Sequence, residues 1–307
     1  MTATGVLVMA HGTPRTPGDL AAFYTEIRRG SPPPPALLAD LERRYQAIGG
    51  LSPLNERTAA QLAGIARALE EHAPGAFRVA GGAKFADPRI EDAVAELAGA
   101  GATPIVGLVL APHFSRASVG EYARRARAAA ASAPGAPALH MIEHWHLTPG
   151  FIALVAARVD EALGALPDDV RARADVLFSA HSVPARLVEE GDPYAEQVRE
   201  SARAVAAEAG LSRWSVVWQS AGRTADAWIG PDVRDAIESS AGAGSRGVVV
   251  CPIGFVSDHL EVLYDIDIEA AAVARRAGLA FARTASLNDD PRFCDVLADV
   301  VRRAVGA

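Results

Sequence analysis

Short apolar runs that alternate with alanine-rich amphipathic stretches are the feature that most limits how this chain can fold. The runs include "GVLVMA", "TPIVGLVLAP", "ADVLFSAHS", "WSVVWQS" and "RGVVVCPIG", and each is followed by a turn signal. A strand that is apolar throughout is buried on both faces, which is typical of a parallel sheet covered by helices. The repeated alternation therefore predicts a doubly wound α/β protein that is built in two halves.

The segments between these runs have the periodicity of helices, and several begin with an N-cap residue or with a proline in the first turn. They are residues 19–29, 35–49, 55–72, 90–99, 118–133, 149–163, 192–209, 231–240, 258–277 and 291–305. The periodicity is interrupted in "APALHMIEHWHLTPG", where small residues, prolines and polar residues cluster. We therefore place the border there, with residues 1–145 in the first half and 146–285 in the second.

Composition excludes several classes of protein. The formal net charge is −7, which argues against a general nucleic-acid binder, because phosphate binding depends on positive charge. The two cysteines, Cys251 and Cys294, lie far apart without a CxxC motif, so a reducing cytoplasm fits better than a disulfide framework. The N-terminus has no basic region, and no apolar stretch reaches the roughly 20 residues of a spanning helix. We expect a cytoplasmic protein without a transmembrane segment.

Polar residues that follow the apolar runs are the candidate site residues, because ligands of doubly wound sheets bind beyond the carboxyl ends of the strands. His11, His113 and His181 each follow such a run, and so does the acidic segment "DHLEVLYDIDIE". A lone strand-end histidine more often makes a local hydrogen bond than performs catalysis, and we interpret His113 and His259 as structural. Cys251 reads as a small core residue.

Three carboxylates in the acidic segment share one helical face. Glu261, Asp265 and Glu269 are spaced i, i+4, i+8, and like charges at this spacing repel by a few tenths of a kcal/mol per pair. These three carboxylates therefore add no stability to a helix. An imidazole and a carboxylate at two strand ends could form an acid–base pair or bind a transient divalent metal. The three carboxylates, here called the acidic row, would then form a path for the cation that leads away from this site. A solvated acidic helix face is an equally good interpretation.

Basic residues cluster in two places near the N-terminus. Arg28 and Arg29 end a predicted helix before a tetraproline run, and Arg43 and Arg44 precede a Gly-Gly turn. Guanidinium groups bind carboxylates in a bidentate fork, so the clusters suit a small polycarboxylate. The alternative is charge that complements a helix macrodipole.

Taken together, these stretches resemble the ferrochelatase family over nearly the whole chain. The stretches occur in the order of that family, and they are "VLVMAHGTP", "FYTEIRRG", "RYQAIGGLSPL", "LAPHFS", "FSAHSVP", "GDPY", "WQSAGR", "WIGPDV" and "GFVSDHLEVLYDID". The likeness is greatest to the soluble coproporphyrin-using members of Gram-positive type. It implies two Rossmann-like halves with an active-site cleft between them and with the C-terminal helix, residues 286–307, packed back on the first half.

The resemblance also implies roles for individual residues. His181 and Glu261 match the pair that faces the metal, with Asp265 and Glu269 along the cation path. The positions that hold the macrocycle and its propionates match Arg28, Arg29, Arg44, Tyr45, Ser52 and Tyr122. His11 stands where close relatives have a tyrosine that coordinates iron, so the resemblance implies His11 as a substrate-binding residue and metal ligand.

The implied activity is insertion of Fe²⁺ into coproporphyrin III during haem synthesis. The expected partners are a porphyrin and ferrous iron, with the protein acting as a monomer that makes transient contacts with neighbouring haem-pathway enzymes. No cofactor is expected beyond the iron substrate, apart from Mg²⁺ as an optional occupant of the acidic row. The alternatives are a protoporphyrin IX ferrochelatase, a cobalt or nickel chelatase of a sirohydrochlorin-type ring, and a non-catalytic porphyrin or haem carrier. A dinucleotide-dependent oxidoreductase is disfavoured because no GxGxxG follows the first strand.

Overall fold

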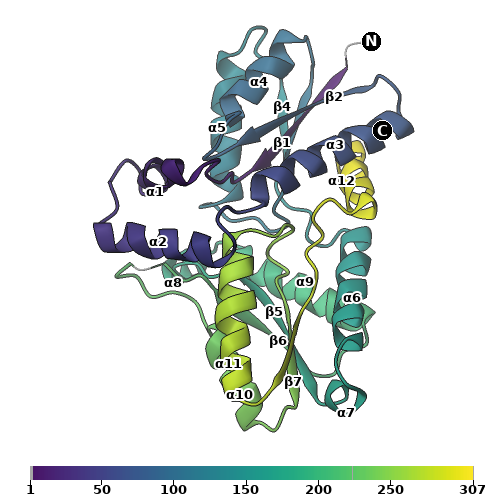
Figure 1. Ribbon diagram of the computed structural model, residues 1–307. Coiled ribbons are helices and arrows are strands. Elements are labelled where there is room, and N and C mark those ends of the chain that lie inside the picture. Colours follow the sequence, from purple (N-terminus) through teal and green to yellow (C-terminus); the bar gives the residue numbers. More distant parts are fainter. Residues whose placement is uncertain (1–2, 223, 307) are drawn as a thin grey trace. The chain divides into compact units, whose positions relative to one another are not determined.

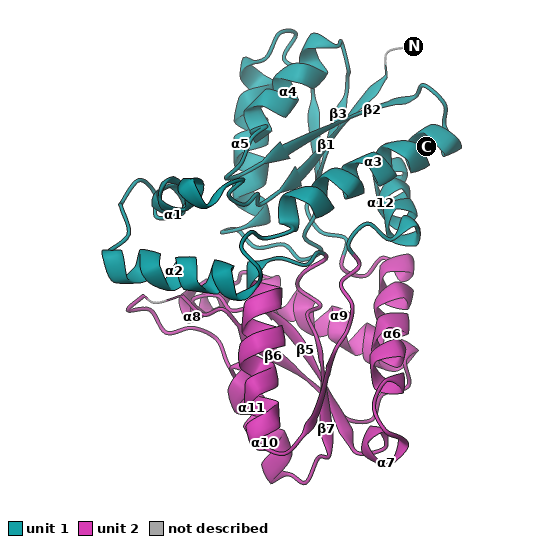
Figure 2. Cartoon of the chain, in the orientation of Figure 1, with its two compact units in different colours: residues 1–145, 257–260, 288–307 teal, residues 146–256, 261–287 magenta. Residues whose placement is uncertain are grey.

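The computed structural model describes residues 3–222 and 224–306, which form two compact units (Figures 1 and 2). Unit 1 comprises Met1–Trp145, Ser257–Leu260 and Asn288–Ala307, and unit 2 comprises His146–Val256 and Glu261–Leu287. Each unit has its own four-stranded parallel sheet with helices on both faces. The predicted doubly wound α/β class in two halves is confirmed.

The two sheets have the same strand order. Unit 1 has the order β2-β1-β3-β4, and unit 2 has the order β6-β5-β7-β8. The elements of unit 1 are β1 (Thr4–Ala10), a 3-10 turn η1 (Pro17–Asp19), α1 (Leu20–Ile27), α2 (Pro35–Ala47), α3 (Leu54–His72), β2 (Phe77–Ala83), α4 (Ile90–Gly99), β3 (Ile105–Val109), α5 (Val119–Ser132), β4 (Leu139–Ile142) and α12 (Pro291–Ala304).

Unit 2 contains the remaining elements, including a π-helix, η2. They are α6 (Pro149–Gly164), α7 (Asp168–Arg171), β5 (Ala174–His181), α8 (Ala185–Glu189), α9 (Tyr194–Glu208), β6 (Trp214–Gln219), α10 (Val233–Gly242), β7 (Gly247–Cys251), η2 (Val262–Ala270), α11 (Ala271–Arg276) and β8 (Ala280–Arg283). In each sheet the order reverses beside the first strand, β1 or β5, and this is the point where doubly wound sheets bind ligands.

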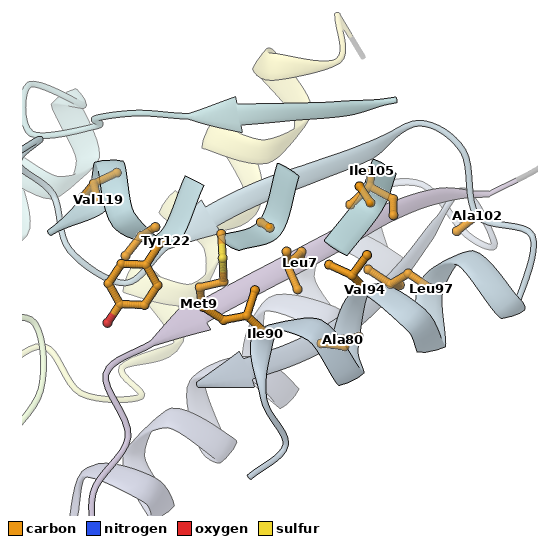
Figure 3. Close-up of a cluster of buried hydrophobic side chains, with 14 residues drawn as sticks. Leu7, Met9, Ala80, Ile90, Val94, Leu97, Ala102, Ile105, Val119 and Tyr122 are labelled. Carbon is orange, nitrogen blue, oxygen red and sulfur yellow. The ribbon is translucent and has the colours of Figure 1, made fainter. Parts of the chain in front are cut away.

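The core of unit 1 lies on both faces of its sheet. On one face, side chains of β1 and β3 pack against α4 and α5, as Leu7, Met9, Val94 and Ile105 show in Figure 3. On the other face, α3 packs against β2 and against the C-terminal helix α12. Phe293 of α12 is fully buried, so the last helix of the chain completes the core that the first strand begins.

The core of unit 2 is built in the same way. Leu177 and Val250 of the sheet pack against Ile237 of α10 and against Ile266 of η2. Helices α6 and α9 contact each other and the sheet. Ile266 and Ala270 of η2 belong to this core, which anchors the helix against the sheet.

Three strands, β2, β4 and β8, were not among the predicted apolar runs. Strand β2 contains two glycines, which weaken a strand pattern but are required by close packing. A Cβ at Gly82 would lie 2.7 Å from the Cα of Ile90, the first residue of α4. Strands β4 and β8 are four-residue edge strands, too short for a clear periodicity.

The predicted helix over residues 258–277 differs from the structure. Helical backbone begins at Leu260, and Val262–Ala270 is a π-helix that continues into α11. Asp258 lies outside the helix, where its main-chain N–H and carboxylate pair with the side chain of Asn288 at 2.9 and 2.8 Å. Among the described residues, we find no helix that is both long and apolar enough to cross a membrane.

Candidate active site

His181 and Glu261 lie together at the carboxyl edge of the unit 2 sheet. His181 ends β5, and Glu261 is the N-cap of η2. The imidazole Nε2 is 3.6 Å from the carboxylate Oε1, and each side chain is 37% exposed. The other ring nitrogen, Nδ1, donates to the main-chain carbonyl of Ser182 at 2.5 Å, since a carbonyl can only accept. The ring is therefore fixed, with Nε2 facing the carboxylate.

The charge of Glu261 controls the protonation of His181. Burial alone lowers the pKa of the imidazole, but the carboxylate charge, its hydrogen bond and the Ser182 carbonyl together raise the pKa of His181 to about 9. At neutral pH the resting pair therefore consists of an imidazolium and a carboxylate. Loss of one proton leaves a neutral imidazole with an available Nε2 lone pair.

This coupling predicts a pH-dependent contribution to stability. The folded-state pKa of about 9 exceeds the ordinary value of 6.5, so the stabilisation is complete below pH 6.5 and is lost as pH rises through 9. We expect Glu261→Gln to lower the free energy of unfolding by roughly 1 kcal/mol at pH 6.5, since solvent screens a pair this exposed. The difference should shrink towards zero by about pH 10, as measured by urea unfolding.

Asp267→Asn is the matched control for this prediction. Asp267 pairs with Arg283 at 2.6 Å in the same unit, and arginine stays charged throughout the range. The loss in free energy of unfolding caused by Asp267→Asn should be the same at pH 6.5 and at pH 10. An equally constant deficit for Glu261→Gln would contradict the coupling.

The remaining two acids of the row have protein partners. Asp265 is buried and accepts a hydrogen bond from the Ser220 hydroxyl, and Glu269 lies 3.7 Å from the Arg234 guanidinium. Across residues 3–222 and 224–306, no three His, Cys, Asp or Glu side chains converge to hold a metal ion. The row is thus a series of separate carboxylates, and a Mg²⁺ occupant stays a prediction.

The separation of His181 and Glu261 suits a shared metal ion. A divalent first-row ion binds such ligands at about 2.0–2.2 Å, so two ligand atoms of one ion can lie up to about 4.2 Å apart. The 3.6 Å between Nε2 and Oε1 falls within that limit. A metal ion can therefore bridge the two side chains, which otherwise form an ion pair.

In unit 1, His11 has the position that His181 has in unit 2. Each stands at the carboxyl end of the strand where the sheet order reverses. The Nδ1 of His11 is 3.0 Å from the Gly12 carbonyl, and its ring packs against Phe85 at 4.8 Å and Phe23 at 6.2 Å between centroids. The exposed imidazole is thus supported from its sides by two aromatic rings.

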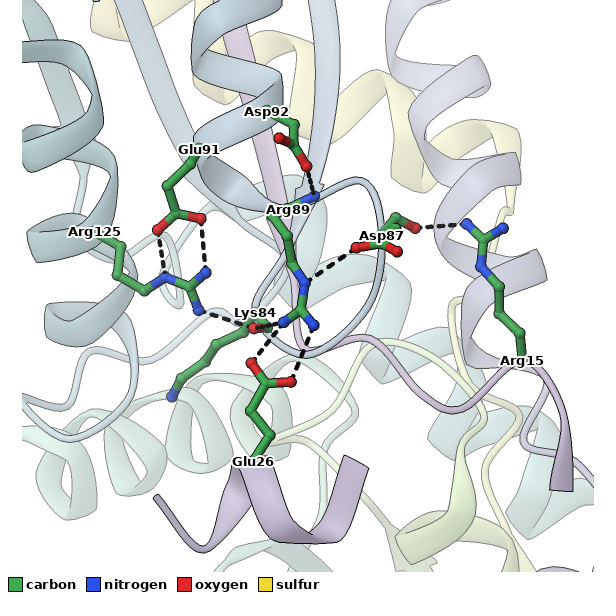
Figure 4. Close-up of polar contacts among 8 residues, drawn as sticks. All are labelled: Arg15, Glu26, Lys84, Asp87, Arg89, Glu91, Asp92 and Arg125. Carbon is green, nitrogen blue, oxygen red and sulfur yellow. Dashed lines mark hydrogen bonds and ion pairs between the residues drawn. The ribbon is translucent and has the colours of Figure 1, made fainter. Parts of the chain in front are cut away.

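A charged network fixes the loop that carries Phe85 (Figure 4). Arg89 and Arg125 each donate to the main-chain carbonyl of Lys84 at 2.9 Å, and their guanidinium groups are paired with Glu26 and Glu91. The Lys84 ammonium group is 2.7 Å from Glu121 and lies over the rings of Phe85 and Tyr122. Lys84 is therefore a buried cation at the carboxyl end of β2. It lies over the ring of Phe85, which in turn packs against the ring of His11.

The other predicted substrate-binding residues all belong to unit 1, and their exposure differs. Arg28 and Arg29 are at the C-terminal end of α1, where Arg28 Nε donates to the Ser31 carbonyl at 3.3 Å and Arg29 has a left-handed backbone (φ 56°). Arg44 is a quarter exposed and contacts Asp40 at 3.0 Å.

The three hydroxyl-bearing residues of this set are buried. The Tyr45 hydroxyl is 2.9 Å from that of Thr13, and the Ser52 hydroxyl accepts from the Leu54 N–H at 3.3 Å. Tyr122 is 5% exposed within the unit 1 core, and its burial raises the pKa of the phenol. The arginines are thus the accessible members, and the hydroxyl groups are held by the protein.

Several residues beside the site were not predicted. Lys84 was missed because β2 was not recognised, although it follows that strand as His11 follows β1. Trp228 lies 6.3 Å from the His181 ring, and Gln219 and Ser220 contact η2. Their motifs, "WQSAGR" and "WIGPDV", were noted without any role.

Comparisons with known proteins identify the family of the chain. Residues 3–305 match the ferrochelatase family. The chain is 43% identical over 307 residues to the coproporphyrin III ferrochelatase of Bacillus subtilis, covering 98% of both proteins. It is 44% identical over 299 residues to the protein of that name from Anoxybacillus flavithermus, covering 97% of this chain and 95% of the relative.

A solved structure supports the fold. SirB from Bacillus subtilis with Fe³⁺ superposes with a TM-score of 0.60 and 11% sequence identity, covering 99% of this chain and 96% of that one. At this identity the likeness concerns the fold alone. The match to the family over residues 3–305, together with identities above 40% over almost the full length, shows that the chain belongs to the ferrochelatase family.

Proposed function

We propose that this protein inserts Fe²⁺ into coproporphyrin III. The observation that carries the proposal is the pair of His181 and Glu261, whose ligand atoms are 3.6 Å apart at the carboxyl edge of the unit 2 sheet. The choice of porphyrin is supported by the relatives at 43% and 44% identity, which are named coproporphyrin III ferrochelatases.

Insertion exchanges one Fe²⁺ for the two pyrrole N–H protons, so the site must both deliver a metal ion and accept protons. Metal binding to His181 and Glu261 requires the imidazolium to lose its Nε2 proton, because imidazole binds metals in its neutral form. Once the iron has passed to the ring, His181 can take up one pyrrole proton, and the second leaves to water at this partly exposed site. The hydrogen bond to Ser182 keeps Nε2 in the same place in both states.

Asp265 and Glu269 are proposed as the cation path. Carboxylate oxygens bind hydrated divalent ions, and separate carboxylates release an ion more readily than a closed cage of ligands does. Ser220 and Arg234 hold these two acids in place. His11 is proposed as an additional iron ligand from unit 1, because its exposed imidazole stands at the corresponding strand end.

The proposed porphyrin-binding residues divide by chemistry. Propionates suit guanidinium groups, which bind carboxylates in a bidentate fork. The macrocycle suits aromatic and hydroxyl-bearing side chains. The full set is Arg28, Arg29 and Arg44 for the propionates, and His11, Tyr45, Ser52 and Tyr122 for the ring.

We expect Arg44→Ala to weaken porphyrin binding by about 10-fold to 100-fold, which is the loss of one charge-assisted hydrogen bond. The rate constant at saturating porphyrin should change little, because Arg44 acts in binding. Quenching of porphyrin fluorescence measures the affinity. Arg43→Ala is the matched control, since Arg43 also contacts Asp40 but is 63% exposed. Equal affinities of the two variants would remove Arg44 from the propionate site.

One assay tests the function. Under anaerobic conditions, Fe²⁺ is offered with coproporphyrin III or with protoporphyrin IX, and the specificity constants are compared. A higher value for coproporphyrin III supports the proposal, whereas a higher value for protoporphyrin IX assigns the alternative substrate. Binding without insertion would identify a carrier, and a preference for Co²⁺ or Ni²⁺ would point to the sirohydrochlorin-type reaction.

We also propose that the protein acts as a monomer in the cytoplasm. Its two cysteines, Cys251 and Cys294, are buried free thiols, and burial raises the pKa of Cys251 to about 12. Unpaired, unreactive thiols suit a reducing compartment. Size-exclusion chromatography with light scattering gives the oligomeric state, and a dimeric mass would overturn the monomer.

A further inference from the structure

Gln219, in the motif "WQSAGR", connects the two residues of the proposed catalytic pair. It ends β6 and pairs in register with His181 of the neighbouring strand β5. Its main-chain carbonyl accepts from the Ser182 N–H at 2.8 Å, and the residue is 1% exposed. Gln219 is therefore fixed to the strand end that bears the imidazole.

The side-chain amide of Gln219 reaches the other residue of the pair. Its Nε2 donates to the main-chain carbonyl of Glu261 at 3.2 Å, and its Oε1 accepts from the Ser179 hydroxyl at 2.8 Å. A carbonyl oxygen can only accept, so the amide nitrogen must face Glu261. Both ends of a fully buried amide are thereby satisfied.

The contact falls where the helix changes its hydrogen-bond pattern. Glu261 is the last α-helical residue before η2, so its carbonyl lies where the α-helical pattern gives way to the π-helix. In an α-helix its donor would be the N–H of Asp265, four residues on. A side-chain donor at this carbonyl competes with that bond. The helix that follows is wider: the Ala271 N–H bonds the carbonyl of Ile266, five residues back.

Ser220 acts on the same turn from the next position. Its backbone is left-handed (φ 58°), which is uncommon for serine, and its hydroxyl donates to the Asp265 carboxylate. Two adjacent residues, Gln219 and Ser220, thus contact the first turn of η2, one at the Glu261 carbonyl and the other at the Asp265 carboxylate.

We propose that Gln219 is a positioning residue that sets the wide first turn of η2 and so holds the Glu261 carboxylate opposite His181. The inference rests on the proposed function for its kinetic consequence. The expected shape of the turn is independent of the proposed function, because it depends on the hydrogen bonds of Gln219.

The kinetic test compares Gln219→Leu and Gln219→Glu with the unaltered protein. Leucine removes the donor at similar volume, and we expect kcat for iron insertion to fall about 10-fold to 100-fold, because small displacements of reacting groups are costly. The KM for porphyrin should stay within about two-fold. Glutamate donates to the Glu261 carbonyl only when protonated. The ratio of its kcat to that of the unaltered protein should therefore rise as pH falls from 8.5 to 6.

Two buried serines supply a matched control. Ser179→Ala leaves the amide of Gln219 without its hydroxyl donor and should lower kcat a few-fold. Ser201 is equally buried in the same unit, and its hydroxyl donates to the carbonyls of Gln197 and His146. Ser201→Ala should cost similar stability and leave kcat unchanged. An unchanged kcat in Gln219→Leu, or a pH-independent ratio in Gln219→Glu, would overturn the inference.

A structural readout separates this inference from the proposed function. In a crystal structure of Gln219→Leu, we expect the Asp265 N–H to bond the Glu261 carbonyl and the first turn to become α-helical. A retained π-helical turn would refute the inference even if kcat fell. If the unaltered protein inserts no iron, the proposed function fails, while this structure still decides what sets the turn.

Discussion

Replacing His181 by alanine is expected to lower the rate of iron insertion by about three orders of magnitude, the largest effect among the variants considered. The change removes an Nε2 that lies 3.6 Å from Glu261, and with it one metal ligand and the proton acceptor of the pair. Porphyrin affinity should change less than about three-fold, because the proposed porphyrin-binding residues belong to unit 1. Anaerobic absorbance assays and porphyrin fluorescence measure the two quantities separately.

Added imidazole is the control for this variant. The cavity left by alanine lies at a partly exposed strand end, so free imidazole at millimolar concentration should restore part of the lost rate. Full turnover without added imidazole would show that His181 takes no part in the chemistry. A loss of porphyrin affinity as large as the loss of rate would assign it to binding instead.

The second large effect is expected from Gly254→Ala, in the loop between β7 and η2. A Cβ at this position would lie 2.6 Å from the Cβ and 2.9 Å from the Cα of Ala180, the residue before His181. Ala180 belongs to the backbone of β5, which can move only at a large cost in free energy. The loop that carries Gly254 must therefore shift, and this displaces Glu261 from the imidazole of His181. We expect kcat to fall about 100-fold and the free energy of unfolding to drop by about 1–3 kcal/mol.

Gly242→Ala is the matched control in the same unit. Gly242 ends α10, and a Cβ there meets no heavy atom within 4 Å. Alanine is a better helix former than glycine, so stability should be equal or slightly higher and kcat unchanged. If Gly254→Ala behaved like Gly242→Ala, the loop would tolerate the shift and the close approach to Ala180 would have no catalytic consequence.

The fold was largely predictable because a parallel sheet buried on both faces leaves an apolar run in the sequence. The prediction failed for strands β2, β4 and β8, whose apolar pattern is weakened by close packing or by their position at a sheet edge. Gly82 in β2 is dictated by the close approach of α4, a tertiary contact that the sequence of β2 alone does not reveal. The edge strands β4 and β8 have one neighbour each and need fewer apolar residues.

The site was predictable to the extent that it follows recognised strands. His181 lies at the end of such a run and Glu261 follows another after a short loop, and their side chains lie 3.6 Å apart. Lys84 follows an unrecognised strand and was missed for that reason. The π-helical form of η2 was also missed, because acids spaced i, i+4, i+8 suit an α-helix equally well. What changes the helix is the amide of Gln219, more than 40 positions earlier in the chain.

The place of α12 in unit 1 has a consequence for how the chain is made on the ribosome. The core of unit 1 needs Phe293 and Leu297, both fully buried, and the Phe293 ring packs 5.9 Å from that of Trp145. All strands of unit 2 have been translated by residue 283, before α12 exists. The nascent chain can thus complete unit 2 before unit 1, which reverses the usual order in which N-terminal units fold first. Until α12 is made, α3 exposes an apolar side that chaperones would recognise.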